Sequence, residues 1–168
     1  MPTHPLIQPV PYRPPMRDLA RVADRPGTLL FDSAAPNDPR SRYSYLCIDP
    51  VRWLTVPPGA NGVGALRDLQ QTIGDFPHTR LPGLPPFQGG AAGLFGYEFG
   101  GSLESLPPPA EAGASHPDMA LGIYDVVLAF DHAREAAWLI STGFPETEAN
   151  ARRRRAAARL AHVDDLLA

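Results

Sequence analysis

The sequence predicts an α+β fold built mainly on antiparallel β-sheet with flanking helices. Segments with β-like patterns come first, and helical segments lie between and after them. Short polar turns separate several of the β-like segments, which is typical of hairpins and not of parallel βαβ units. A chain of 168 residues, of which 43% are hydrophobic and 20% charged, is long enough and apolar enough for one domain with a core.

The N-terminal part begins with a predicted helix over residues 14–24. Pro14 and Pro15 suit the first turn of a helix, and apolar residues follow at helical spacing. The glycine of Arg25-Pro26-Gly27 ends the helix. Residues 28–31 then form a short buried strand, and residues 35–39 form a loop.

Residues 42–49 alternate well enough to predict a strand, with Tyr43, Tyr45 and Cys47 on one side. Asp49-Pro50 ends this strand, and residues 53–56 form another. A helix follows, because Leu66, Leu69 and Ile73 repeat on one face.

Residues 86–98 mix four glycines with large apolar residues, which predicts a strand or a tight pair of strands with close backbone approach. We expect Tyr97-Glu98 to continue in β conformation. The run lacks the glycine pattern of a dinucleotide fold, and a Walker loop needs a lysine that the chain does not contain. A packing role for the glycines is therefore favoured. A proline-rich loop is expected over 107–117.

The C-terminal part predicts a hairpin, with strands at 119–130 and 136–141 joined by a polar turn at 131–135. A terminal helix runs over 147–167, with Ala156, Leu160, Val163 and Leu167 on one stripe. The arginine run at 152–155 is expected on its solvated surface.

The overall composition excludes several classes of function. A net charge of −3 and a pI near 5.9 argue against nucleic-acid binding and against a polybasic membrane anchor. All 15 basic residues are arginine, which excludes a lysine nucleophile within this chain. The one cysteine, Cys47, allows neither an internal disulfide nor a cysteine metal cluster, and is expected to be a buried small hydrophobe. No signal peptide or membrane span is expected. We therefore expect a cytoplasmic location.

Titratable residues predict neither a metal site nor a catalytic pair. The histidines are scattered, without metal-ligand spacing: His4, His78, His116, His132 and His162. His132 is expected to be exposed in the hairpin turn. Glu98 and Asp125 could form an acid/base pair, but partnership with arginine or with a backbone cap is favoured.

Several segments together resemble one family. Asp32-Ser33-Ala34, residues 41–46 (Ser-Arg-Tyr-Ser-Tyr-Leu) and Asp49-Pro50 resemble the opening strands of anthranilate and aminodeoxychorismate synthase component I. Residues 86–98 (Pro-Phe-Gln-Gly-Gly-Ala-Ala-Gly-Leu-Phe-Gly-Tyr-Glu) resemble its glycine-rich signature. The segments Glu104-Ser105-Leu106-Pro107 and 117–125 (Pro-Asp-Met-Ala-Leu-Gly-Ile-Tyr-Asp) resemble the aminodeoxychorismate (para-aminobenzoate synthase) branch. The likeness runs in order over about residues 28–142.

This resemblance implies a chorismate-utilising synthase of two lobes. Such enzymes add ammonia, supplied by a glutamine amidotransferase subunit, to chorismate. The aminodeoxychorismate branch makes 4-amino-4-deoxychorismate for folate biosynthesis, and the anthranilate branch makes anthranilate for tryptophan biosynthesis. Magnesium and, in the aminodeoxychorismate branch, a lysine nucleophile belong to the C-terminal half.

The resemblance predicts that residues 1–144 are the N-terminal-like domain of the family. Residues 145–168 would be a terminal helix leading to a C-terminal chorismate-binding domain that is missing from this chain. We therefore expect no catalytic residue, no magnesium site and no turnover in this chain alone. Because the two lobes pack sheet on sheet, the chain alone should be marginally stable or should self-associate.

The resemblance also implies a tryptophan pocket, lined by Asp32, Ser33, Arg42, Tyr43 and Ser44. Asp32 would bind the amino group of tryptophan, Ser33 its amino-acid head group, and Arg42 its carboxylate. Tyr43 and Ser44 would line the pocket from the adjacent strand. Ser33 could instead be a turn former, and Arg42 could form a solvent ion pair.

Two alternatives remain open. The chain could be the corresponding lobe of an anthranilate synthase. It could also be a free-standing module that binds tryptophan or a partner protein, an alternative that a stop codon directly after Ala168 would favour.

Overall fold

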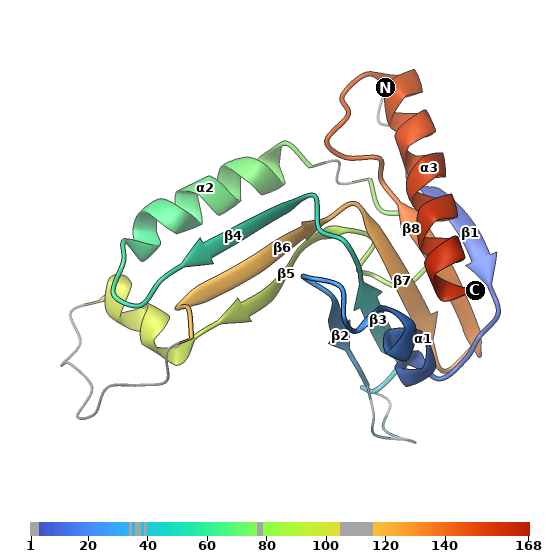
Figure 1. The fold of residues 1–168 in the computed structure, drawn as a ribbon, viewed down its shortest axis with the longest axis horizontal. Coiled ribbons are helices and arrows are strands. Elements are labelled where there is room, and N and C mark those ends of the chain that lie inside the picture. The colour runs from blue at the N-terminus through green and yellow to red at the C-terminus, as the bar shows by residue number, and fades with distance from the viewer. Residues whose placement is uncertain (1–3, 34, 36–37, 39, 77–78, 105–115) are drawn as a thin grey trace.

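The computed structural model describes residues 4–33, 35, 38, 40–76, 79–104 and 116–168. Two antiparallel sheets meet at an angle, and helices cover the outer side of each sheet (Figure 1). This arrangement confirms the predicted α+β class. Within the described residues, no helix is both long and apolar enough to cross a membrane.

The larger sheet, sheet A, contains five strands in which every neighbouring pair is antiparallel. Its order is β1 (Leu6–Val10), β8 (Ala136–Ser141), β7 (Val126–Asp131), β3 (Tyr43–Cys47) and β2 (Leu29–Phe31). Strand β7 is buried at every position, which explains its continuous apolar run.

The smaller sheet, sheet B, contains three strands. Its order is β4 (Arg52–Val56), β6 (Met119–Tyr124) and β5 (Gly90–Phe95). Strand β6 is central and pairs with both neighbours in antiparallel fashion, so that Trp53 and Ala92 lie on either side of Gly122.

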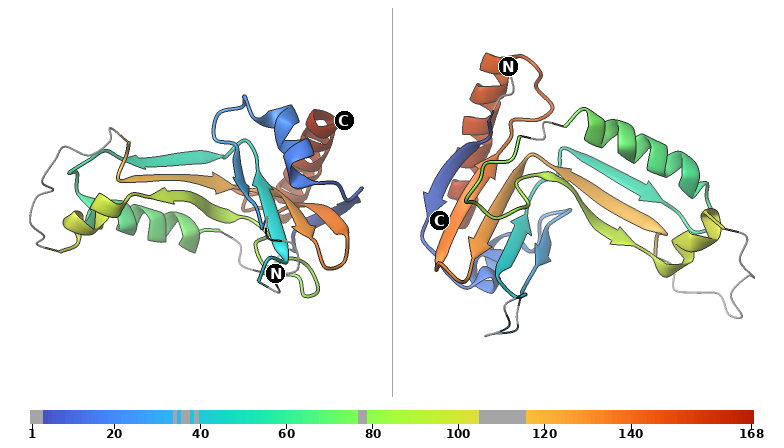
Figure 2. Two further views of the ribbon diagram at one scale, coloured as in Figure 1. Left: turned by 90° about the horizontal axis from the view of Figure 1, so that it is seen from below. Right: turned by 180° about the vertical axis from the view of Figure 1, so that it is seen from behind.

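The helices lie on the outer faces (Figures 1 and 2). Helices α1 (Pro15–Val22) and α3 (Ala149–Leu167) pack on sheet A, and α2 (Gly62–Gly74) packs on sheet B. The predicted stripe of α3 is confirmed, because Ala156, Leu160, Val163 and Leu167 are its buried residues. The Asn61 side chain caps α2 by accepting a hydrogen bond from the amide of Gly64 at 3.0 Å.

The predicted strand over 119–130 is wrong as a single element. The chain leaves sheet B after β6 and enters sheet A at β7, with Asp125 between the two strands. The hairpin itself is confirmed for β7 and β8 only. At the change of sheet, the Asp125 carbonyl accepts from the Thr142 amide at 2.8 Å, and its carboxylate accepts from Arg159 at 3.0 Å. The expected partnership of Asp125 with arginine is therefore confirmed.

Three further features differ from the predictions. Strand β1 lies before residue 14, where no element was predicted. Tyr97-Glu98 do not continue in β conformation but begin a 3₁₀ helix, η1 (Tyr97–Ser102). The arginine run of α3 is not wholly solvated, since Arg152 and Arg155 donate to the carbonyls of Thr142 and Phe144 at 2.9 and 2.8 Å.

Some sequence predictions lie outside the described residues. These are Ala34, most of the 35–39 loop, His78, and residues 105–115, which include Ser105-Leu106-Pro107 and most of the proline-rich loop.

Candidate functional site

The five residues predicted to bind tryptophan lie together at one end of sheet A. Strands β2 and β3 are antiparallel, with Phe31 opposite Tyr45, so the chain that leaves β2 lies beside the chain that enters β3. This register brings together the residues Asp32, Ser33, Arg42, Tyr43 and Ser44. We call this group, with the neighbours described below, the strand-end cluster.

Ser44 is the centre of the strand-end cluster and is fully buried. Its hydroxyl oxygen accepts from the Ser33 amide at 2.9 Å and donates to Asp32 Oδ1 at 2.8 Å. His132 Nε2 lies 2.7 Å from the same oxygen, and Tyr12 lies 2.8 Å from His132 Nδ1. Because Ser44 has one proton, which Asp32 accepts, a neutral His132 must donate from Nε2 and accept from Tyr12. With this tautomer, each hydrogen bond in the series Tyr12–His132–Ser44–Asp32 has one donor and one acceptor.

Ser33 and Arg42 have partners within the protein. The Ser33 hydroxyl donates to the Tyr43 carbonyl at 2.6 Å, which leaves its lone pairs for a ligand donor. The Arg42 guanidinium grips Asp131 with two bonds of 3.0 and 2.8 Å and lies 4.9 Å from the centre of the Tyr43 ring. The partner of Arg42 is thus a buried carboxylate of β7, and a ligand carboxylate would have to share the guanidinium with Asp131.

Sequence reasoning missed three members of the cluster: Tyr12, Asp131 and His132. The expectation that His132 is exposed is wrong, because its ring is half-buried, bonded to Ser44 and stacked parallel to Phe130. The register of β3 on β7, which pairs Tyr43 with Asp131, brings Asp131 and His132 to the site, and Tyr12 reaches it through its bond to His132. No local pattern in the sequence encodes that register.

The cluster presents a carboxylate to solvent. Arg42 neutralises Asp131 and holds the pKa of that carboxyl below its usual range. Asp32 is exposed and, among the described residues, has no cationic side chain within ion-pair distance. An ammonium group of a ligand would supply the missing charge. Partial burial, with the charges of Glu135 and Asp131, raises the pKa of Tyr12, which keeps it a donor to His132.

The one cysteine of the chain, Cys47, is not an activated nucleophile. Burial raises the pKa of the Cys47 thiol to about 12, so it remains protonated, and the predicted role of a buried small hydrophobe is confirmed. The parts of the chain that the structure describes also contain no group of three or more histidine, cysteine or acidic residues arranged to hold a metal ion.

Large apolar side chains are exposed on the side of each sheet that its helices leave free, although the central strands of sheet A are buried on this side at Cys47, Val127, Ala129 and Ile140. On the side of sheet B opposite α2, Trp53 and Leu94 are 44% and 48% exposed, and Phe31 of sheet A is 44% exposed. Phe87 covers part of this surface by packing edge-on against Tyr45, with ring centres 5.7 Å apart. Within the described residues no helix lies on this side (Figure 1). We call this surface the inner face.

The glycine-rich segment serves packing, as predicted. A Cβ atom on Gly93 would overlap the carbonyl oxygen of Ala120 and would lie 2.9 Å from the Cα atom of Leu121. Strands β5 and β6 therefore approach more closely than a side chain would allow.

Known proteins match this chain over most of its length. It is 36% identical to aminodeoxychorismate synthase component 1 of Salmonella typhimurium over 151 residues, covering 82% of this chain and 33% of the relative. It is 37% identical to the Escherichia coli protein of the same name over 147 residues, covering 80% of this chain and 31% of the relative. It is also 32% identical to anthranilate synthase component 1 of Mycobacterium tuberculosis over 135 residues, covering 71% and 26% of the two chains. No protein-family model matches the chain.

The chain belongs to the aminodeoxychorismate and anthranilate synthase component 1 family. It spans about a third of the length of the first two relatives and corresponds to their N-terminal region. The name component 1 implies that members of this family work with a partner component. In this family member, the strand-end cluster and the inner face are features that a partner or a ligand could recognise.

Proposed function

We propose that this chain is the N-terminal lobe of an aminodeoxychorismate synthase component 1. The whole enzyme would convert chorismate and ammonia into 4-amino-4-deoxychorismate for folate biosynthesis, with a glutamine amidotransferase subunit supplying the ammonia. The amination itself is assigned to a C-terminal chorismate-binding segment, with its magnesium ion, because the sequence of this chain contains no lysine to act as the family nucleophile.

The open inner face is the observation that supports this proposal. Trp53, Leu94 and Phe31 are large apolar residues, each close to half exposed, on one side of two sheets. Burying the exposed half of one such side chain stabilises an interface by roughly 1 kcal/mol, and exposed apolar surface of this kind marks interaction sites. Since the relatives are about three times as long as the matched region, the occupant that we assign to this face is the C-terminal segment of the synthase.

The choice of branch follows the degree of similarity. Identity to relatives named aminodeoxychorismate synthase component 1 is 36–49%, against 32–34% for those named anthranilate synthase component 1. Anthranilate synthase is the alternative, and it predicts a different product from the same substrate.

Reading the gene beyond the Ala168 codon and assaying its purified product test the reaction. A frame that continues into a chorismate-binding segment, and a product that releases 4-amino-4-deoxychorismate from chorismate, ammonium and Mg²⁺, support the proposal. Release of anthranilate would move the chain to the other branch. A frame that stops after Ala168 overturns the enzyme assignment and leaves a binding module.

A chimera tests the role of the inner face. In it, this chain replaces the matching N-terminal region of the Escherichia coli relative. We expect the chimera to turn over chorismate and the Escherichia coli C-terminal part alone to be inactive. Trp53→Asp should abolish turnover, whereas Val63→Asp, on exposed α2 surface, should not. A cooperatively folded chimera in which Trp53→Asp has no effect contradicts docking on the inner face.

For the strand-end cluster we propose tryptophan binding, with Asp32 accepting from its ammonium group. The exposed, uncompensated carboxylate supports this role. Ser33, Tyr43 and Ser44 would line the pocket, and Arg42 would share its guanidinium between Asp131 and the ligand carboxylate.

Calorimetric titration of the chimera tests the tryptophan site. Asp32→Asn should weaken L-tryptophan by about tenfold or more, since it removes a charge-assisted bond, and should leave 3-indolepropionate, which has no ammonium group, unchanged. Asp68→Asn, an exposed carboxylate on α2, is the matched control. Equal weakening of both ligands, or no tryptophan binding at all, would count against the site.

A further inference from the structure

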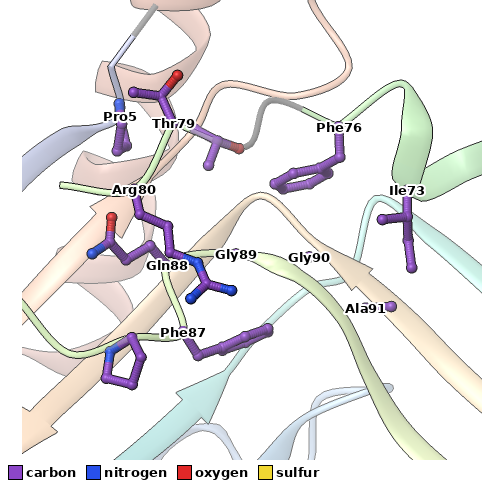
Figure 3. A pocket seen from close by; sticks show the side chains of 12 residues that line it. Pro5, Ile73, Phe76, Thr79, Arg80, Phe87, Gln88, Gly89, Gly90 and Ala91 are labelled. Atoms are coloured by element: carbon purple, nitrogen blue, oxygen red, sulfur yellow. The ribbon is translucent and has the colours of Figure 1, made fainter.

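A cavity of about 220 Å³ lies away from the strand-end cluster, where the C-terminal end of α2 approaches the start of β5 (Figure 3). Ile73, Phe76 and Phe87 supply its apolar walls. Arg80 and Thr142 supply polar groups on other sides.

We infer that this cavity binds a small ligand with one flat apolar ring and one carboxylate, the ring lying between Phe76 and Phe87 and the carboxylate on Arg80. This inference does not rest on the proposed synthase function, because it uses only the residues that line the cavity.

Arg80 is the group that selects the carboxylate. Its guanidinium points into the space bordered by Phe87 and Gln88 (Figure 3). Among the described residues no carboxylate lies within 4 Å of it, whereas Arg25 and Arg42 each grip an aspartate with two bonds. Arg80 is exposed to solvent at the edge of the cavity, and its guanidinium offers a planar fork that matches a carboxylate.

The walls of the cavity are held in place by contacts outside it. Phe76 packs on Phe144 with ring centres 4.9 Å apart, and Phe87 packs on Tyr45. The buried Gln88 side chain accepts from the Leu81 amide at 2.9 Å and donates to the carbonyls of Leu81 and Pro85 at 2.9 and 3.2 Å. Because these bonds fix the segment that carries Phe87, the site loses little conformational entropy when a ligand binds.

Two glycines border the cavity and keep it open. Gly89 and Gly90 have φ angles of +121° and +130°, which side chains rarely adopt. A Cβ atom on Gly89 would lie 3.1 Å from the Phe76 ring and 3.2 Å from the Thr142 methyl group, so a side chain there would crowd two of the lining residues.

The volume of the cavity and the charges of its lining limit the kinds of ligand that it can bind. The volume is below the roughly 300–1,000 Å³ of sites for drug-sized molecules, which suits a single ring. The described lining contains no acidic residue, so an ammonium group would lack a partner here. The cavity thus complements a simple ring carboxylate and not the amino acid that we assign to the strand-end cluster.

Titration of the 168-residue chain with benzoate, followed by NMR of backbone amides, tests the inference. We expect benzoate to shift the amides of Gly89 and Gly90, with weaker responses to benzyl alcohol, which lacks the charge, and to acetate, which lacks the ring. Arg80→Gln should weaken benzoate by about tenfold or more. Arg67→Gln, which removes the same charge from the exposed surface of α2, should bind benzoate like the wild type.

A second variant probes the apolar part of the cavity. Ala91→Leu adds carbon atoms to a lining residue and should weaken benzoate and benzyl alcohol alike, whereas Arg80→Gln should affect benzoate only. Cooperative melting of each variant confirms that it is folded. The inference is overturned if benzoate leaves Gly89 and Gly90 unshifted, if acetate acts as strongly as benzoate, or if Arg80→Gln binds benzoate like the wild type.

Discussion

At the scale of single residues, arginine takes every cationic role in this chain. Two buried aspartates illustrate the pattern, since Arg42 donates to Asp131 from Nε and from one terminal nitrogen, and Arg159 donates to Asp125 at 3.0 Å. Burial raises the pKa of Asp125, and the charges of Arg159 and Arg155 oppose that shift. At Asp131 the hydrogen bonds from Arg42 dominate instead, and the pKa falls. The ion pair at the strand-end cluster therefore stabilises the fold when its carboxylate is charged.

Replacing Asp131 with asparagine should expose this contribution. We expect Asp131→Asn to lower the free energy of unfolding by about 1–2 kcal/mol at pH 7, a modest value because the partly exposed Arg42 is screened by solvent. The folded pKa of Asp131 is below its unfolded value near 3.9, so the stabilisation is complete above that value and is lost as pH falls through the folded pKa.

Urea unfolding at several pH values measures this difference. The gap between wild type and Asp131→Asn should be constant near neutrality and should shrink once the pH falls below about 4. Asp68→Asn, on exposed α2 surface, should show no gap. A gap that is independent of pH would show that Asp131 acts through its shape and not through its charge.

At the scale of elements, the sequence correctly predicted those features that depend on residues close together in the chain. The apolar stripe of α3 and the β7–β8 hairpin follow from spacing and turn chemistry within a few residues. The division of 119–130 between two sheets was missed because both halves are equally apolar. Their partners, β4 and β3, lie about 63–88 residues earlier, and no periodicity within 119–130 distinguishes them.

Strand β1 and the full strand-end cluster were missed for the same reason, because both depend on pairing between strands that are far apart in the sequence. Pro9 sits in β1, which is an edge strand, and only the edge position tolerates a residue without an amide donor. Asp32, Ser33 and Ser44 could be proposed together because the family resemblance implies a pocket at these residues. His132 lies 88 residues from Ser44 and reaches it only through strand pairing.

Strand β5 offers a prediction at this scale, because its pairing with β6 depends on a residue without a side chain. Gly93→Ala should lower the free energy of unfolding by about 2–4 kcal/mol, since the new methyl group would overlap the Ala120 carbonyl and the φ of +155° is unfavourable for alanine. Gly74→Ala, at the end of α2 with no atom within 4 Å of its Cβ position, is the control and should change stability little.

Thermal melting and hydrogen exchange of the β5 amides measure the effect. Gly93→Ala should speed the hydrogen exchange of the β5 and β6 amides. The β7 and β8 amides should remain protected when wild type and variant are compared at equal overall stability. If Gly93→Ala melts like Gly74→Ala, the two strands have room to separate and the close approach is not required for the fold.

At the scale of the whole molecule, helices protect only one side of each sheet. The outer faces are buried under α1, α2 and α3, and the largest buried cluster lies between sheet A and its two helices. The inner face has no such cover within the described residues, apart from the segment that carries Phe87 (Figures 1 and 2). The strand-end cluster lies at one end of sheet A, and an occupant of the inner face would reach its Tyr43, whereas Asp32 and Ser44 lie on the helix-covered side with Leu30 and Leu46.

This asymmetry predicts that the chain by itself associates with copies of itself through the inner face. Trp53 and Leu94 lie on the same side of sheet B, where Trp53 flanks Gly122 and Leu94 flanks Ala120. Burying them against a second copy removes apolar surface from water, whereas an aspartate at either position would have to be desolvated.

Sedimentation velocity at rising concentration should therefore show oligomers for the wild type, and Trp53→Asp or Leu94→Asp should shift the chain toward monomer. Val63→Asp adds the same charge on exposed α2 surface and should associate like the wild type. A wild-type chain that stays monomeric at all concentrations and unfolds cooperatively would mean that the inner face is stable in water, and it would remove the main physical reason for assigning a C-terminal segment to it.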